Sequence, residues 1–90
     1  MYSLKFEDEA KEDLAKLKKS EPKAFDKATK LLEELQDHPK TGTGKPKPLS
    51  RNRSGQWSRK ITDKHRLIYK IEEEEVVVLV LSAWGHYDDK

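Results

Sequence analysis

Residues 76–84 read Val-Val-Val-Leu-Val-Leu-Ser-Ala-Trp, and this stretch decides the fold. It contains no charged side chain, and its β-branched and aromatic residues favour a strand over a helix. An apolar strand with no polar alternation is typical of the interior of a sheet, where both faces are covered. We therefore expect residues 75–84 to form a central strand, with helices on one face and side chains partly covering the other.

Two further strands precede it. Residues 66–72 and 57–62 each carry the alternating pattern of a half-buried strand. Glu73 and Glu74 form the expected tip of the hairpin between the last two strands. In residues 66–71, alternation places Arg66, Ile68 and Lys70 on one face of the strand. The alternate residues of the same stretch lie on the other face, which we expect to meet the helices.

The first half of the chain predicts one strand and two helices. Residues 2–6 alternate as a short strand, residues 7–19 show helical spacing of Ala10, Leu14 and Leu17, and a second apolar stripe continues to Asp37. Ser20-Glu21-Pro22 is a helix start signal that leaves a very short turn, so the helices should form an antiparallel hairpin. Residues 37–55 are rich in Pro and Gly and indicate a structured loop.

These elements predict an α+β fold: a small antiparallel sheet in the order β-α-α-β-β-β, with a two-helix hairpin packed on one face. Ninety residues suffice for a single domain, 1–90. The absence of cysteine excludes disulfides and thiolate metal sites, and the histidines are too scattered for a zinc site. We expect no metal, no cofactor, no membrane segment and a cytoplasmic location.

The charges are segregated along the chain. Residues 40–70 hold ten Lys or Arg and one Asp, whereas residues 71–90 hold one Lys and six Asp or Glu. Such a basic segment suits a polyanion, because phosphate contacts supply most non-specific nucleic-acid affinity. A solvated basic loop is the alternative. The candidate contacts to RNA or the ribosome are Lys45, Arg51, Arg53, Lys60, Lys64 and Lys70.

The chain end adds residues that can do chemistry. His86 can donate or accept a proton near neutral pH, and the neighbouring Tyr87 offers a ring for stacking or a hydroxyl for a phosphate. A solvated histidine is the simpler alternative. Arg59 and Lys60 point to opposite faces, so one of them should join Arg66 on the open face. Cations, a histidine acid and an aromatic ring are what RNA cleavage by its own 2′-hydroxyl requires.

Four motifs in series carry a resemblance: GKPKPL (44–49), SGQWSRKIT (54–62), HRLIYKI (65–71) and SAWGHYD (82–88). Together they resemble the YoeB/Txe toxins of bacterial toxin–antitoxin modules, within the wider RelE/ParE group. The resemblance implies a RelE-like fold, metal-independent cleavage of mRNA in the ribosomal A site, and a YefM-like antitoxin as partner. It also allows a homodimer. By motif it implies Arg66 as the stabiliser of transition-state charge, His86 as general acid, Tyr87 as orienting residue and Arg59 as a further basic residue.

Lys47 departs from the family pattern, which commonly has a glutamate there as general base. Loss of a general base costs roughly 10²–10⁴-fold in rate. Three interpretations stay open. Lys47 acts as in the related RelE enzymes, whose sites are built from basic residues; the ribosome positions the nucleophile so well that the base matters little; or the chain is an attenuated variant. Two other functions stay open: a ParE-like toxin that inhibits DNA gyrase, and a non-catalytic RNA- or ribosome-binding module.

Overall fold

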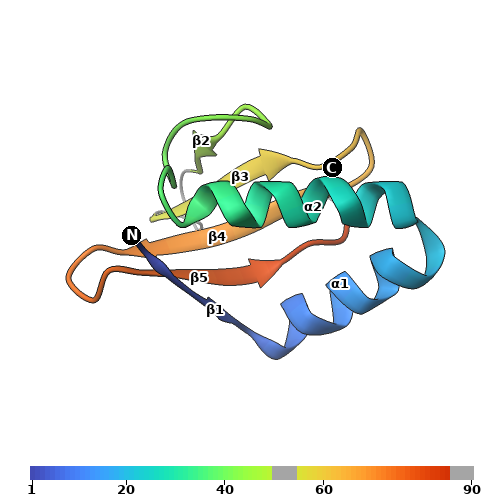
Figure 1. Cartoon of the computed structure of the whole chain (residues 1–90), viewed down its shortest axis with the longest axis horizontal. Coiled ribbons are helices and arrows are strands. Elements are labelled where there is room, and N and C mark those ends of the chain that lie inside the picture. Colours follow the sequence, from blue (N-terminus) through green and yellow to red (C-terminus); the bar gives the residue numbers. More distant parts are fainter. Residues whose placement is uncertain (50–54, 86–90) are drawn as a thin grey trace.

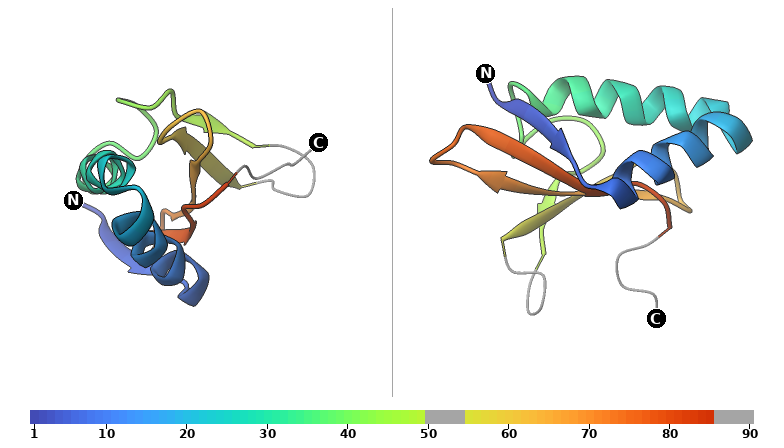
Figure 2. Two further views of the ribbon diagram at one scale, coloured as in Figure 1. Left: turned by 90° about the vertical axis from the view of Figure 1, so that its right-hand side faces the viewer. Right: turned by 90° about the horizontal axis from the view of Figure 1, so that it is seen from below.

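The computed structural model describes residues 1–49 and 55–85, which form a sheet with two helices on one of its faces (Figures 1 and 2). The elements are β1 (Ser3–Phe6), α1 (Asp8–Ser20), α2 (Pro22–Leu35), β2 (Lys47–Pro48), β3 (Gln56–Lys60), β4 (Arg66–Glu72) and β5 (Val77–Ser82). The strands lie in the order β1-β5-β4-β3-β2. The predicted α+β fold with a helical pair on one face is confirmed.

Strand β5 occupies the interior position that its apolar sequence predicts, between β1 and β4. Val78 and Val80 are fully buried on the helix-covered face. The β4–β5 register shifts after them, since Tyr69 pairs with Val80 while Ile68 pairs with Ser82. Leu81 is thus an extra residue in β5, and this bulge lets Ala83 re-enter the core, where it is fully buried.

The sheet is mixed, which corrects the expectation of a purely antiparallel one. β1 runs parallel to β5, with Ser3 opposite Val77 and Phe6 opposite Val80. The helical pair brings the chain back to where β1 begins, since the Tyr2 amide donates to the Gln36 carbonyl at 2.6 Å. A further correction is β2, a two-residue strand on β3 that lies inside the predicted loop.

The helices bury the stripes that their spacing predicts. Leu17 of α1 and Leu31 and Leu35 of α2 are fully buried, each contributing about 1.5–3 kcal/mol of transfer free energy. Only Glu21 separates the helices, and Pro22 occupies the first turn of α2, where its missing N–H costs no hydrogen bond. α2 ends at Leu35, two residues before the predicted end. The predicted helical hairpin is therefore confirmed.

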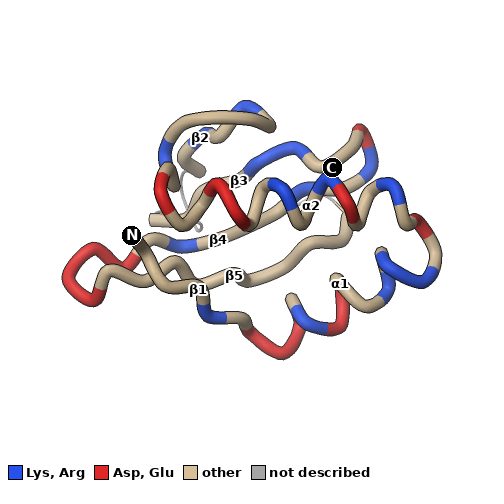
Figure 3. The backbone as a smooth tube through the Cα atoms, viewed as in Figure 1, with Lys and Arg blue, Asp and Glu red and all other residues tan. Residues whose placement is uncertain are grey.

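The charges remain segregated in three dimensions. Acidic residues gather at the turn between β4 and β5, while Lys and Arg follow β3 and the loop that leads to β2 (Figure 3). Within residues 1–49 and 55–85, neither helix has the length and hydropathy needed to span a bilayer. The basic end of the sheet is the part of the described surface best suited to bind an anionic ligand.

Candidate functional site

A cationic cleft lies on the face of the sheet that the helices leave open. It has a volume of about 220 Å³ and is lined by Gly44, Lys45, Lys47, Ser58, Lys60 and Arg66. Four of these residues carry a positive charge, and no Asp or Glu is among them. A concave surface with this lining concentrates positive potential and favours a phosphate-bearing ligand.

Strand register brings the cations together. Lys47 of β2 pairs with Ser58 of β3, and Lys60, two residues further along, pairs with Arg66 of β4. Paired residues in an antiparallel ladder project to the same side, and so do residues two apart on a strand. Lys47, Lys60 and Arg66 therefore share one face because β2 docks on β3, which the loop prediction for residues 37–55 did not foresee.

The guanidinium of Arg66 is oriented by backbone carbonyls of the β3–β4 turn. Its Nη1 donates to the Thr62 oxygen at 2.7 Å and to the His65 oxygen at 3.3 Å. Lys60 forms an ion pair with Asp63 of the same turn at 2.6 Å, and that contact holds the pKa of Asp63 below its usual value. The turn thus fixes both side chains at the mouth of the cleft.

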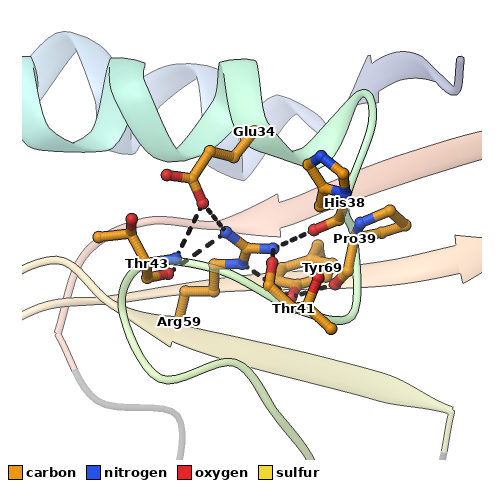
Figure 4. A network of polar contacts seen from close by, with 7 residues as sticks. All are labelled: Glu34, His38, Pro39, Thr41, Thr43, Arg59 and Tyr69. Atoms are coloured by element: carbon orange, nitrogen blue, oxygen red, sulfur yellow. Dashed lines mark hydrogen bonds and ion pairs between the residues drawn. The ribbon is translucent and has the colours of Figure 1, made fainter.

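Arg59 lies on the other face, which corrects its expected place among the cations that meet substrate. Its side chain is fully buried beneath α2. Its Nη1 donates to Glu34 at 2.8 Å and to the Thr43 carbonyl at 3.3 Å (Figure 4). Its Nη2 donates to the carbonyls of His38 and Thr41. Of the two neighbouring cations on β3, Lys60 therefore joins the open face.

The buried guanidinium anchors the loop that follows α2. Nε of Arg59 donates to the Tyr69 hydroxyl at 3.2 Å, and this hydroxyl donates to the Pro39 carbonyl at 2.7 Å (Figure 4). Glu34 also accepts a bond from the Thr43 amide at 2.9 Å. Hydrogen bonding to Thr43, with the Arg59 guanidinium, holds the pKa of Glu34 below its usual value. Apart from the charge of Arg59, no feature of the sequence indicated this network.

Gly44 allows the loop that Arg59 anchors to place the next residue, Lys45, in the cleft. Gly44 has φ +85°, and a Cβ there would lie 3.0 Å from the Lys60 carbonyl oxygen and 3.3 Å from Leu31. Its own carbonyl accepts the Lys60 amide proton at 2.7 Å. Only glycine adopts this positive φ without strain and has no Cβ to collide with these atoms. Gly44 therefore lets the loop lie directly on the end of β3.

Residues 83–85, directly after β5, are held by polar side chains whose role was not predicted from the sequence. The Ala83 amide donates to Asp13 of α1 at 3.0 Å, and the Gly85 amide donates to Nδ1 of His65 at 2.9 Å. Asp13 sits on the buried face of α1 between Ala10 and Leu17. An acid within an apolar stripe was the available signal, because a buried carboxylate requires a partner.

The structure brings some predicted residues together and separates others. Lys45, Lys47, Lys60 and Arg66 line one cleft. Lys70 is exposed and pairs with Gln56 farther along the same strands. Lys64 forms an ion pair with Glu21 at 3.5 Å, at the junction of the helices. The predictions for Arg51, Arg53, His86 and Tyr87 fall outside the described residues.

Comparison with known proteins gives consistent results. The sequence model of the YoeB-like toxin of bacterial type II toxin–antitoxin systems matches residues 6–87. The chain is 40% identical over 87 residues to the toxin RelK of Mycobacterium tuberculosis, covering 97% of this chain and all of that protein. It is 32% identical over 80 residues to the toxin YoeB of Escherichia coli, covering 89% of this chain and 93% of the relative.

Solved structures agree with the sequence comparison. A YoeB/ParE toxin from Agrobacterium tumefaciens superposes with a TM-score of 0.89 at 27% identity, covering 94% of this chain and 99% of the other. The YoeB–YefM complex from Staphylococcus aureus gives a TM-score of 0.82 at 28% identity, covering 97% of this chain and 99% of the other. This chain therefore belongs to the YoeB-like toxin family of bacterial type II toxin–antitoxin systems.

Proposed function

We propose that this toxin is an endoribonuclease that inhibits translation by cleaving mRNA in the ribosomal A site. The observation that supports the proposal is the cleft of four cations on the open face, in which Arg66 and Lys60 stand directly opposite each other. Phosphoryl transfer needs positive groups where negative charge develops on the phosphate oxygens. The cleft supplies them from rigid strands and from an anchored loop.

The proposed reaction is an internal transfer within the RNA. The 2′-oxygen attacks the adjacent phosphorus and loses its proton, the bond from phosphorus to the 5′-oxygen breaks, and that oxygen takes up a proton. The products are a 2′,3′-cyclic phosphate and a 5′-hydroxyl. Arg66 stabilises charge on the non-bridging oxygens, His86 donates the proton to the leaving oxygen, and Tyr87 orients the scissile region.

Because of Lys47, we expect removal of the proton from the 2′-hydroxyl to be the slow step. It lines the cleft with Arg66 and stands where the family pattern commonly places a glutamate base. A protonated lysine binds phosphate but cannot accept a proton, whereas a carboxylate in reach of the 2′-hydroxyl can. We expect an enzyme that binds RNA well and cleaves it slowly.

An antitoxin is the proposed physiological partner. A YefM antitoxin accompanies the similar YoeB toxin of Staphylococcus aureus, and a YoeB dimer from the same organism superposes with a TM-score of 0.82. The open face of this chain is cationic, so an antitoxin segment rich in carboxylates would compete with RNA for the same charges. A second copy of the chain is the other proposed partner.

The test is a reconstituted translation reaction with purified toxin and a defined mRNA. Primer extension should find a cut within the A-site codon, and the upstream fragment should end in a 2′,3′-cyclic phosphate. Binding to ribosomes without such ends would instead favour a non-catalytic binding module. Inhibition of DNA gyrase supercoiling without RNA cleavage would favour the ParE-like alternative.

A further inference from the structure

Residues 83–85, the last that the structure describes, are fixed by contacts from two separate parts of the chain, α1 and the start of β4. Asp13 of α1 accepts the Ala83 amide proton at 3.0 Å, and His65 Nδ1 accepts the Gly85 amide proton at 2.9 Å. The Gly85 carbonyl in turn accepts the Arg66 amide proton at 2.9 Å. Gly85 is thereby bonded on both sides to the start of β4.

The geometry defines the tautomer of His65. A backbone N–H can only donate, so Nδ1 of His65 carries no proton and accepts the bond from Gly85. The proton of the neutral ring then resides on Nε2, which lies 2.9 Å from a carboxylate oxygen of Glu21. Glu21 therefore selects the tautomer in which the other nitrogen can hold Gly85.

The surroundings hold the ring still. His65 is 1% exposed, and its ring centroid lies 4.4 Å from that of Trp84. The ammonium of Lys16, on α1, lies 4.5 Å from the centroid of the Trp84 ring. Of the charged groups near this contact set, Glu21 contacts the His65 ring itself. Lys64 pairs with Glu21, Lys16 lies over the Trp84 ring, and Asp13 accepts the Ala83 amide proton.

We propose that His65 is a positioning residue for the proposed RNA cleavage, holding Gly85 against Arg66, which lines the cationic cleft. This inference rests on the proposed function, in which His86 is the general acid. In the sequence His86 is the residue after Gly85. The Gly85 carbonyl accepts the amide proton of Arg66, which lines the cleft, so the bond from Gly85 to His65 ties this end of β4 to the last described residue. Small displacements of a reacting group can cost on the order of 10²-fold in rate.

Two substitutions separate the two nitrogens of the imidazole. In His65→Asn the amide oxygen can take the place of Nδ1 and accept the Gly85 amide proton, while the bond to Glu21 is lost. In His65→Gln the amide nitrogen can take the place of Nε2 and donate to Glu21, while the acceptor for Gly85 is lost. The variants are similarly polar, so a general loss of stability should affect both.

The experiment compares kcat and KM for mRNA cleavage on programmed ribosomes, with the Gly85 amide followed by NMR hydrogen exchange. We expect His65→Asn to keep kcat within a few-fold and His65→Gln to lose at least about tenfold, with unchanged KM and faster Gly85 exchange in the second variant. Tyr2→Phe is the control, because it removes a long-range hydrogen bond, to Glu73 at 2.8 Å, outside this contact set.

Each outcome either supports or contradicts the positioning role of His65. Equal kcat values in His65→Asn and His65→Gln, whether normal or reduced, would contradict the positioning role. A loss confined to KM would contradict it as well. A wild-type chain that cleaves no RNA would overturn the proposed function and this inference together, whereas equal variants beside an active wild type would overturn this inference alone.

Discussion

Lys60 and Arg66 face each other directly across the β3–β4 ladder, so two cations share one cross-strand position. Like charges at such a position destabilise a sheet. Asp63 offsets part of this repulsion through its ion pair with Lys60 at 2.6 Å and its longer-range attraction to Arg66. A bound phosphate between the two cations would relieve the repulsion. The pair is therefore costly for the fold and useful for binding a polyanion.

The first prediction concerns this pair. Replacing Lys60 with Gln should weaken binding of single-stranded RNA and make it less dependent on salt. The slope of log K against log salt should fall by about 0.7, the value for one phosphate contact on a single strand. Fluorescence anisotropy at several salt concentrations measures it. Lys11→Gln, on the exposed surface of α1, is the control and should leave the slope unchanged.

A second prediction concerns Lys47. Lys47→Glu places a carboxylate in the cleft opposite Ser58, where it can accept the proton of the 2′-hydroxyl. General-base assistance is worth roughly 10²–10⁴-fold, so kcat should rise while KM also rises through the lost cation. Single-turnover cleavage on ribosomes measures both. Identical cleavage by the two forms would show that position 47 does not supply the base.

A third prediction separates support from chemistry on β3. Arg59→Lys keeps the charge but loses the planar fork that contacts Glu34 and the loop carbonyls. We expect a loss of about 2–3 kcal/mol in the free energy of unfolding, measured by urea denaturation, since buried carbonyls lose their donors. Lys60→Gln, the next residue on the same strand, should cost less than about 1 kcal/mol. Equal losses would contradict the assignment of Arg59 to the loop.

The alternation of residues along a strand indicates which face of the sheet each side chain occupies. It does not indicate which strands lie next to each other. The apolar run of β5 and the alternation of β4 placed Arg66 and Lys70 on the open face, as observed. Alternation does not encode strand direction, so the parallel pairing of β1 with β5 was not predicted. Nor can it detect a two-residue strand such as β2, which exists because the loop is tied down by Arg59.

The buried polar contacts were likewise beyond the sequence. Asp13, Glu21 and His65 come from different parts of the chain and meet only through the packing of α1 and α2 on the sheet. Arg59 illustrates the same limit, because its motif indicated a basic residue near the site while its partner Glu34 is set by the position of α2. The sequence shows the type of each residue, but it does not show which residue each one contacts in the folded protein.

A fourth prediction follows from Glu34, whose pKa is lowered by hydrogen bonds from Thr43 and by Arg59. A carboxyl whose folded pKa lies below its unfolded value stabilises the fold fully above the unfolded value, and this contribution disappears as the pH falls through the folded value. The loop around Thr43 should therefore loosen only below the usual pKa of glutamate. An NMR titration of the Thr43 amide checks this, and a midpoint at or above 4.5, the ordinary value, would contradict it.

The assignment of this cleft as the active site is tested by the single-turnover rate of mRNA cleavage on ribosomes by Arg66→Ala, compared with wild type and with Lys11→Ala. Arg66 lines the cationic cleft and is held by the Thr62 carbonyl at 2.7 Å. Removing one group that stabilises transition-state charge typically costs about 10²–10³-fold. We predict a loss of that size for Arg66→Ala, in a protein with a normal circular dichroism spectrum, and none for Lys11→Ala. Cleavage by Arg66→Ala at the wild-type rate would contradict the assignment of this cleft as the active site.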